Sequence, residues 1–338
     1  MVVKNRCLYK GCTMKQATKL LALASLLVAG QAMHAQAPAS TIPAAMGADV
    51  PELMQLIEKR KTDPNTPINM QNKQLQGAQL PNKVNLSNAN FTGSDFSNAT
   101  LSGAILTDAV LHNVNFTNAK LQDITFIDSY AKRINMSDAD LSRANFSGSG
   151  LENVNFKNAN LSHANFTDAF LESTQTTGNI KLYLTKANLT NANFTNAKLK
   201  YIDLVGAICI NTNFTKTELI SCDMKEANLT GATLTNTTFN NVDLRKVNFT
   251  NSSGFTSITL TDDTYLNDAT GLTPEQQAYA RSKKAIGVPG VIPIGERFGS
   301  INFKPIDTSG LHNKVQKMNE TMMQPFSDLS DFRKRWGI

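Results

Sequence analysis

The stretch ANLSHANFTDAFL, residues Ala159–Leu171, places a large apolar residue at every fifth position. On an α-helix a step of five residues advances about 500°, so these residues would spiral around all sides of the helix. On a β-strand they would alternate between the two faces. Neither regular element can bury the whole set. The pattern therefore predicts a backbone that turns a corner every five residues.

The period continues in both directions, by fives from Leu86 to Leu171 and again from Leu184 to Phe249. We call each large apolar residue a centre. A small residue stands two positions before most centres, and Asn, Asp and Gly, which suit tight turns, fill much of the remainder. At a spacing of twenty residues the centres match in type, so we expect core ladders on a four-sided solenoid. These ladders are Leu101, Leu121, Leu141 and Leu161; Phe96, Phe116, Met136 and Phe156; and Phe126, Phe146 and Phe166.

The units ANLSH, ANFTD, ANLTN and ANFTN resemble the A-(D/N)-L/F-x-x signature of the pentapeptide-repeat family, over residues 84–249. The resemblance implies an all-β solenoid, a right-handed quadrilateral β-helix with short flanking helices. It also implies that a homodimer can form through C-terminal elements. The best-understood members of this family resemble B-DNA in shape and charge and bind DNA gyrase.

The N-terminal region has the pattern of a secretory signal peptide, which we expect over residues 1–37. Five Lys or Arg residues and no acidic residue precede the apolar run Leu20–Gly30, and Ala35-Gln-Ala37 offers a cleavage site. The run is too short to span a membrane, so the processed chain is expected to have no transmembrane span. Export to the bacterial periplasm or out of the cell follows. Cleavage would lower the net charge from +6 to near +1, so no nucleic-acid partner is expected.

The rest of the chain divides into four expected parts. Residues 38–73 form an Ala/Pro linker and a short capping helix from Asp49 to Glu58, ended by Pro64 and Pro67. Residues 74–265 form the solenoid, with a loop break at 172–183 that is either a tolerated insertion or a functional loop. Residues 266–287 form a second capping helix. The tail, residues 288–338, holds an amphipathic segment from 315 to 336 that either packs on the solenoid or faces a partner or a membrane surface.

The second capping helix carries clear terminal signals. Thr273 is the candidate N-cap, Pro274 fits the first turn and Gln276 stands at the third position of a capping box, while Gly287 is expected to close the helix.

No known catalytic motif occurs in the sequence, so we expect a non-enzymatic protein without a cofactor. His112 and His163 lie 51 positions apart, which is no multiple of twenty, so a shared metal site is not expected. Cys209 occupies a centre and Cys222 a small-residue position, and both are expected in the core, with a disulfide as the alternative. An enzyme would require a polar pocket in the 172–183 loop or in the tail.

Four residues are candidates for interaction: Tyr130, Lys132, Arg133 and Trp336. Around Ala131, which replaces a large centre, Lys132 and Arg133 are expected to point outward. Lys132 and Glu152 stand one coil apart, so the competing interpretation is an exposed ion pair of little energetic value.

The leading hypothesis is an exported scaffold that binds an unknown protein. The alternative is a DNA mimic that interacts with a topoisomerase such as gyrase. Residues 84–249 carry 13 Lys/Arg and 14 Asp/Glu, a net charge of −1. A DNA duplex of similar length would carry dozens of negative charges, which disfavours the mimic.

Overall fold

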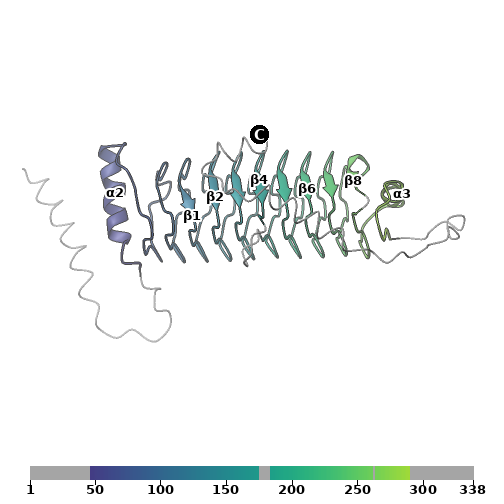
Figure 1. Ribbon diagram of the computed structural model, residues 1–338, viewed down its shortest axis with the longest axis horizontal. Helices are drawn as coiled ribbons and strands as arrows, with labels where there is room; N and C mark the ends of the chain where they lie inside the picture. Colours follow the sequence, from purple (N-terminus) through teal and green to yellow (C-terminus); the bar gives the residue numbers. More distant parts are fainter. Residues whose placement is uncertain (1–45, 175–182, 262, 290–338) are drawn as a thin grey trace, which may run out of the picture. The chain divides into compact units, whose positions relative to one another are not determined.

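A computed structural model describes residues 46–174, 183–261 and 263–289 (Figure 1). The predicted signal peptide, residues 175–182 of the break and the tail from residue 290 lie outside these ranges. The described elements follow in chain order. They are α2 (Val50–Thr62), β1 (Leu111–His112), β2 (Tyr130–Lys132), β3 (Gly150–Glu152), β4 (Phe170–Glu172), β5 (Lys198–Lys200), β6 (Glu218–Ile220), β7 (Thr238–Asn240), η1 (Phe255–Ser257), β8 (Thr259–Leu260) and α3 (Pro274–Ser282).

The eight strands form one parallel sheet in sequential order, with each strand on the next coil (Figure 1). Leu111 pairs with Ala131 and Ala131 with Leu151, so these coils repeat after twenty residues, whereas steps at the ends of the stack, such as Asn69 with Asn90, span 21 or 22. Isolated parallel bridges run along the other three sides, such as Asn115 with Asn135, Lys120 with Asp140 and Thr125 with Asn145. Four ladders in each coil confirm the predicted β-solenoid.

The interior is filled by the centres. All eleven residues of the three expected ladders lie in the core, each no more than 1% exposed. On one side the rings of Phe146 and Phe166 stack with centroids 4.9 Å apart, and Phe194 and Phe214 continue the stack at 5.4 Å. Alanine occupies most of the positions two residues before a centre. Where Thr212 or another hydroxyl residue stands there, its hydroxyl donates to a backbone carbonyl of the preceding coil.

The corners adopt the left-handed backbone conformation two residues after each centre. Asn98 and Asn118 do so with φ near 58°, as expected for asparagine, but Arg143, His163 and Lys186 adopt it as well. Asparagine and aspartate have a second role one residue before the centre. There the Asn115 Oδ1 atom accepts the backbone N–H of the residue two positions later, and this pattern recurs along the solenoid.

Helix α2 closes the N-terminal end of the core. Its residues Val50, Leu53 and Ile57 are buried in the same cluster as the first coils. The helix extends to Thr62, four residues beyond the expected end. It stops there because Asp63, the residue before Pro64, is disfavoured in the helical conformation. Bridge pairing begins at Asn69, which is earlier than the expected start of the solenoid at residue 74.

Helix α3 lies at the other end of the stack (Figure 1). The Thr273 hydroxyl accepts the Gln276 N–H at 3.2 Å and the Gln276 side chain accepts the Thr273 N–H at 2.8 Å, which completes the expected capping box. The Tyr279 hydroxyl donates to the Ile258 carbonyl at 2.7 Å and holds the helix against the last coils. The helix ends at Ser282 rather than at Gly287, because Ile286 returns to the ladder and pairs with Tyr265.

Candidate interaction face

The outward side of β2–β5 carries a set of side chains that are buried, or nearly so in the case of Lys132, without belonging to the core. The centres of these strands point into the solenoid, so the residues on either side of each centre project outward. We call the following set the β2–β5 outer patch: Tyr130, Lys132, Glu152, Phe170, Glu172 and Lys200.

Burial distinguishes this patch from the rest of the same side. Phe170 is 1% exposed and Glu172 2%, although neither belongs to the apolar core cluster. Val110 in the same column is 38% exposed, and Asn240 at the far end is exposed as well. Something therefore covers the side chains of β2–β5 that does not cover their neighbours along the stack.

Two ion pairs stack within the patch. Lys132 Nζ lies 2.9 Å from Glu152 Oε1, and Lys200 Nζ lies 3.1 Å from Glu172 Oε1. Glu152 and Glu172 are register partners on adjacent coils, so the order along the column is positive, negative, negative, positive. Two buried carboxylates side by side repel each other, and each is compensated by the lysine on its far side. Losing either lysine would remove one of these two ion pairs.

Further hydrogen bonds fix the Glu152 carboxylate. The Tyr130 hydroxyl donates to it, and the Thr174 hydroxyl donates to its Oε1 atom at 3.0 Å. Thr174 also exchanges hydrogen bonds with the Asn153 side chain at 2.7 and 3.0 Å, so the start of the break is tied to the patch. Burial, followed by the neighbouring Glu152 charge, raises the pKa of Tyr130, which keeps its hydroxyl a proton donor.

His112 borders the patch one coil before Lys132. Its ring meets the Tyr130 ring edge-on, with centroids 5.6 Å apart. Its Nδ1 atom is buried and finds no hydrogen-bond partner among the described residues. Burial lowers the pKa of His112, Lys132 and Arg133 lower it further, and Glu152 opposes them. The imidazole is therefore held in its neutral form.

The candidate interaction residues predicted from the sequence differ in their exposure to solvent. The Lys132–Glu152 pair forms, but it is buried rather than exposed as expected, because this side of the solenoid is covered. Arg133 stands at an exposed corner with φ 54°. Trp336 lies outside the described residues. Phe170, Glu172 and Lys200 were not predicted from the sequence, although the triplets FLE and KLK on either side of the break could have indicated them.

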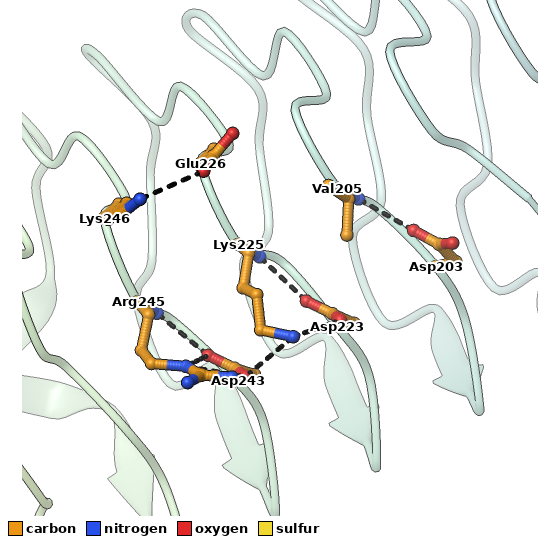
Figure 2. Close-up of polar contacts among 8 residues, drawn as sticks. All are labelled: Asp203, Val205, Asp223, Lys225, Glu226, Asp243, Arg245 and Lys246. Atoms are coloured by element: carbon orange, nitrogen blue, oxygen red, sulfur yellow. Dashed lines mark hydrogen bonds and ion pairs between the residues drawn. The ribbon is translucent and has the colours of Figure 1, made fainter.

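The side that holds the Met136 ladder carries a second polar cluster in its C-terminal half (Figure 2). Lys225 Nζ bridges Asp223 and Asp243, at 2.8 and 3.2 Å, and so links two coils. Arg245 binds the same Asp243 carboxylate at 2.6 Å. Burial raises the pKa of Asp243, but the hydrogen bonds from Arg245 and Lys225 outweigh it and the net shift is downward. This carboxylate stays charged.

The neighbouring corner pairs Lys246 with Glu226 at 3.4 Å, and Asp203 accepts the Val205 N–H at 3.0 Å (Figure 2). Both members of the corner pair are more than half exposed, so the pair contributes little to stability. Opposite charges along this side thus neutralise each other from coil to coil.

The described residues offer little for metal or thiol chemistry. Within residues 46–174, 183–261 and 263–289, no three His, Cys, Asp or Glu side chains come together as a metal site. Cys209 and Cys222 are free and buried, and burial raises the pKa of each thiol to about 12. A thiol with so high a pKa is a poor nucleophile. Among the helices in these ranges, none is long and apolar enough to cross a membrane.

Family comparison agrees with the geometry. A model of the pentapeptide repeat region matches residues 81–156, and a model of eight copies of the pentapeptide repeat matches residues 182–208 and 212–251. Residues 81–156, 182–208 and 212–251 are therefore pentapeptide repeats. No curated protein matches the sequence.

Solved structures of similar proteins include HetL, a pentapeptide repeat protein involved in heterocyst differentiation regulation in the cyanobacterium Nostoc. It is 22% identical over 63% of this chain and 92% of its own, with a TM-score of 0.32. QnrB1, a plasmid-mediated fluoroquinolone resistance protein, is 20% identical over 66% of this chain and 99% of its own, with a TM-score of 0.30. A pentapeptide repeat protein from the thylakoid lumen of Arabidopsis thaliana is 22% identical over 46% and 77%, with a TM-score of 0.16.

Proposed function

We propose that this protein is a non-enzymatic scaffold, exported to the periplasm or out of the cell, that binds another protein along its solenoid. The observation that carries the proposal is the unbroken register of the ladders from Asn69 to Ile286. Each outward column is displayed at a spacing of about 4.8 Å on a core that does not depend on it. A partner that matches one column can therefore be held at many points at once.

The sides of the solenoid differ in chemistry, which supports selective recognition. The side with the stacked Phe ladder carries hydrogen-bonded Asn and Thr: Thr195 Oγ1 donates to Asn193 Oδ1 at 2.6 Å and accepts from Asn213 Nδ2 at 3.0 Å. From Thr125 to Thr215 its two outward columns contain no charged residue. They are Thr125, Asn145, Asn165, Asn193 and Asn213, and Ile127, Ser147, Thr167, Thr195 and Thr215. The side shown in Figure 2 carries alternating charges instead.

Export is supported by the basic N-terminus, the apolar run Leu20–Gly30 and the small residues that follow it. Its test is fractionation of cells that express the full chain with a C-terminal tag. We expect a shortened form in the periplasm or the medium. The matched control carries Leu23→Arg and Leu26→Arg in the apolar run, which should leave the full-length chain in the cytoplasm. A cytoplasmic, unshortened chain in both cases would refute export.

Partner binding is tested in the same cells. A lysine-reactive crosslinker applied to the intact envelope should join the processed chain to one recurrent protein, identified by mass spectrometry. The crosslinked lysines should cluster on one side of the solenoid, because one column makes the contact. Crosslinks scattered evenly over all four sides, with no recurrent protein, would contradict the scaffold.

A further inference from the structure

The β2–β5 outer patch is covered, and the described elements do not account for the cover. Tyr130 and Phe170 stand two coils apart in one outward column, with Gly150 between them. Gly150 places no side chain between the two aromatic residues, and the two ion pairs lie in the neighbouring outward column. Helices α2 and α3 lie at the two ends of the stack, away from β2–β5 (Figure 1). Neither helix therefore covers the patch.

We infer that the β2–β5 outer patch is the docking surface for the chain's own C-terminal segment, residues 315–336. This segment has the composition that the patch requires, with apolar residues at helical spacing and aromatic rings near its end. They are Val315, Met318, Met322, Phe326, Leu329, Phe332 and Trp336. An apolar face of this kind can bury the rings of Tyr130 and Phe170.

Length also favours this occupant. The patch lies about 25 Å along the stack from the last coil, at about 4.8 Å for each coil. Residues 290–314 separate the last described residue from the segment, and an extended chain of that length reaches about 80 Å. Pro325 would divide a helix here, but helical stretches over residues 315–324 and 325–336 would each extend about 15–18 Å, enough to lie across the four strands of the patch.

The break is a poorer occupant. Its residues 175–182 read QTTGNIKL, with only Ile180 and Leu182 as larger apolar residues and no aromatic ring. The chain leaves the ladder at Thr174 and pairs again at Tyr183, so these eight residues must span the way out and back. They cannot easily enclose two rings and two ion pairs.

Charge complementarity points the same way. Acidic residues stand at the corner beside the patch: Asp128 and Asp168 lie two residues before Tyr130 and Phe170, with Gly148 on the coil between them, and Asp108 lies at the same corner one coil earlier. The C-terminal segment ends in the basic run Arg333-Lys334-Arg335, directly after Phe332 and before Trp336. With the aromatic residues on the patch, this run would lie within reach of these acidic residues.

Docking would also affect the proposed function, and this consequence is the only part of the inference that rests on that function. A segment that occupies β2–β5 withholds that part of the surface from a partner. A partner that binds there must displace the segment, so docking of the segment lowers the apparent affinity of the protein for that partner. The docking itself requires no partner and is tested on the purified chain.

Trp336 is the only tryptophan of the chain, so its fluorescence reports the position of the segment directly. We expect blue-shifted emission and weak quenching by acrylamide in the full chain, both lost on unfolding in urea. Gly150→Arg, which places a long charged side chain between Tyr130 and Phe170, should shift the emission to the red and raise the quenching constant severalfold. The matched control is Thr238→Arg, in the same column but on β7 outside the patch, and it should behave as the unmodified chain. Circular dichroism should show the solenoid intact in both variants.

A second pair of variants tests the basic run. Replacing Arg333, Lys334 and Arg335 by Glu should expose Trp336, whereas Lys314→Glu with Lys317→Glu should not. Trp336 emission in the folded chain that equals emission in urea would overturn the proposal. So would equal quenching in Gly150→Arg and Thr238→Arg, or hydrogen exchange that rises in Gly150→Arg only at residues 175–182. Weak quenching in the full chain and in Thr238→Arg with stronger quenching in Gly150→Arg, but no partner found in the envelope, would instead contradict the scaffold and leave the docking supported.

Discussion

Phe166 and Phe194 stand 28 positions apart in the sequence, yet their rings stack in parallel, with centroids 4.7 Å apart and an interplanar angle of 2°. Every other step of this ladder spans twenty residues. The described coils on the two sides of the break therefore keep the register of the ladder, and the Phe166 N–H still donates to the Asn193 carbonyl at 2.7 Å. The ladder is held by stacking between coils, not by the connection that joins them.

Phe166→Ala is expected to destabilise the solenoid by about 3–5 kcal/mol, because it removes a fully buried ring between two stacked neighbours and leaves a cavity. Urea unfolding followed by circular dichroism measures the change. The control is Lys157→Ala, which removes an exposed side chain nine positions before Phe166. It should change the free energy of unfolding by less than about 0.5 kcal/mol. Equal effects from both substitutions would contradict the ladder.

Lys132→Met is expected to cost about 3 kcal/mol, because it leaves the buried Glu152 charge without its lysine. The matched control is Arg143→Met, which breaks the ion pair with Asp123 at 2.7 Å, also one coil apart but with both side chains more than half exposed. That loss should stay below about 1 kcal/mol. The two variants are compared by chemical denaturation at one pH, and a cost as small for Lys132→Met as for Arg143→Met would show that the patch is open to water.

The stability of the solenoid should depend on pH through His112. Its pKa in the folded chain lies below the value near 6.5 of the unfolded chain, mainly because the ring is buried. The unfolded chain therefore binds more protons between the two pKa values, and the stability from neutral His112 is lost as the pH falls through about 6.5. Unfolding midpoints at about pH 7.5 and about pH 5.5 should differ less in His112→Gln than in the unmodified chain. An identical difference in both chains would rule out this role.

The purified chain from residue 38 onward should not inhibit DNA supercoiling by gyrase. Its repeat region carries nearly equal numbers of acidic and basic residues, and the charges near Asp243 are paired with one another. A surface of this kind lacks the dense negative field of a duplex. A supercoiling assay over a wide concentration range checks this, and inhibition that responds to substitution of Asp223 or Asp243 would favour the DNA mimic over the scaffold.

Thr273→Ala should destabilise the C-terminal end by about 1 kcal/mol, because it removes one half of the capping box of α3. Native-state hydrogen exchange should show faster exchange in α3 and at the adjoining Ile258, and little change at Leu161 in the middle of the stack. Slowed or unchanged exchange at α3 would show that the cap does not hold the helix.

The core could be predicted because a period of five admits one solution. Apolar residues at that spacing share an interior only if the chain turns at each pentapeptide, and the match of types at twenty residues sets the number of sides. The capping box at Thr273 and Gln276 could be predicted equally well, because capping depends on residues close together in the sequence. The end of α2 was placed too early because the sequence offered Pro64 as a stop but no mark at Glu58.

The buried ion pairs escaped prediction for a different reason. Whether Lys132 and Glu152 are exposed depends on what lies over their side of the solenoid, and the five-residue period contains no such information. The pairing of Lys200 with Glu172 also required knowing that the break leaves the register intact. Covering segments outside the repeat decide the environment of an outward residue, whereas the repeat itself decides only that the residue points outward.

The left-handed corners, occupied by Arg143, His163 and Lys186 as readily as by asparagine, separate surface chemistry from foldability. Because ladder hydrogen bonds impose the corner conformation, mutations in evolution can change the charge of single corner residues while the core stays unaltered. The same freedom would let an engineer write a new pattern of ligands along an edge at a pitch fixed by the polypeptide itself.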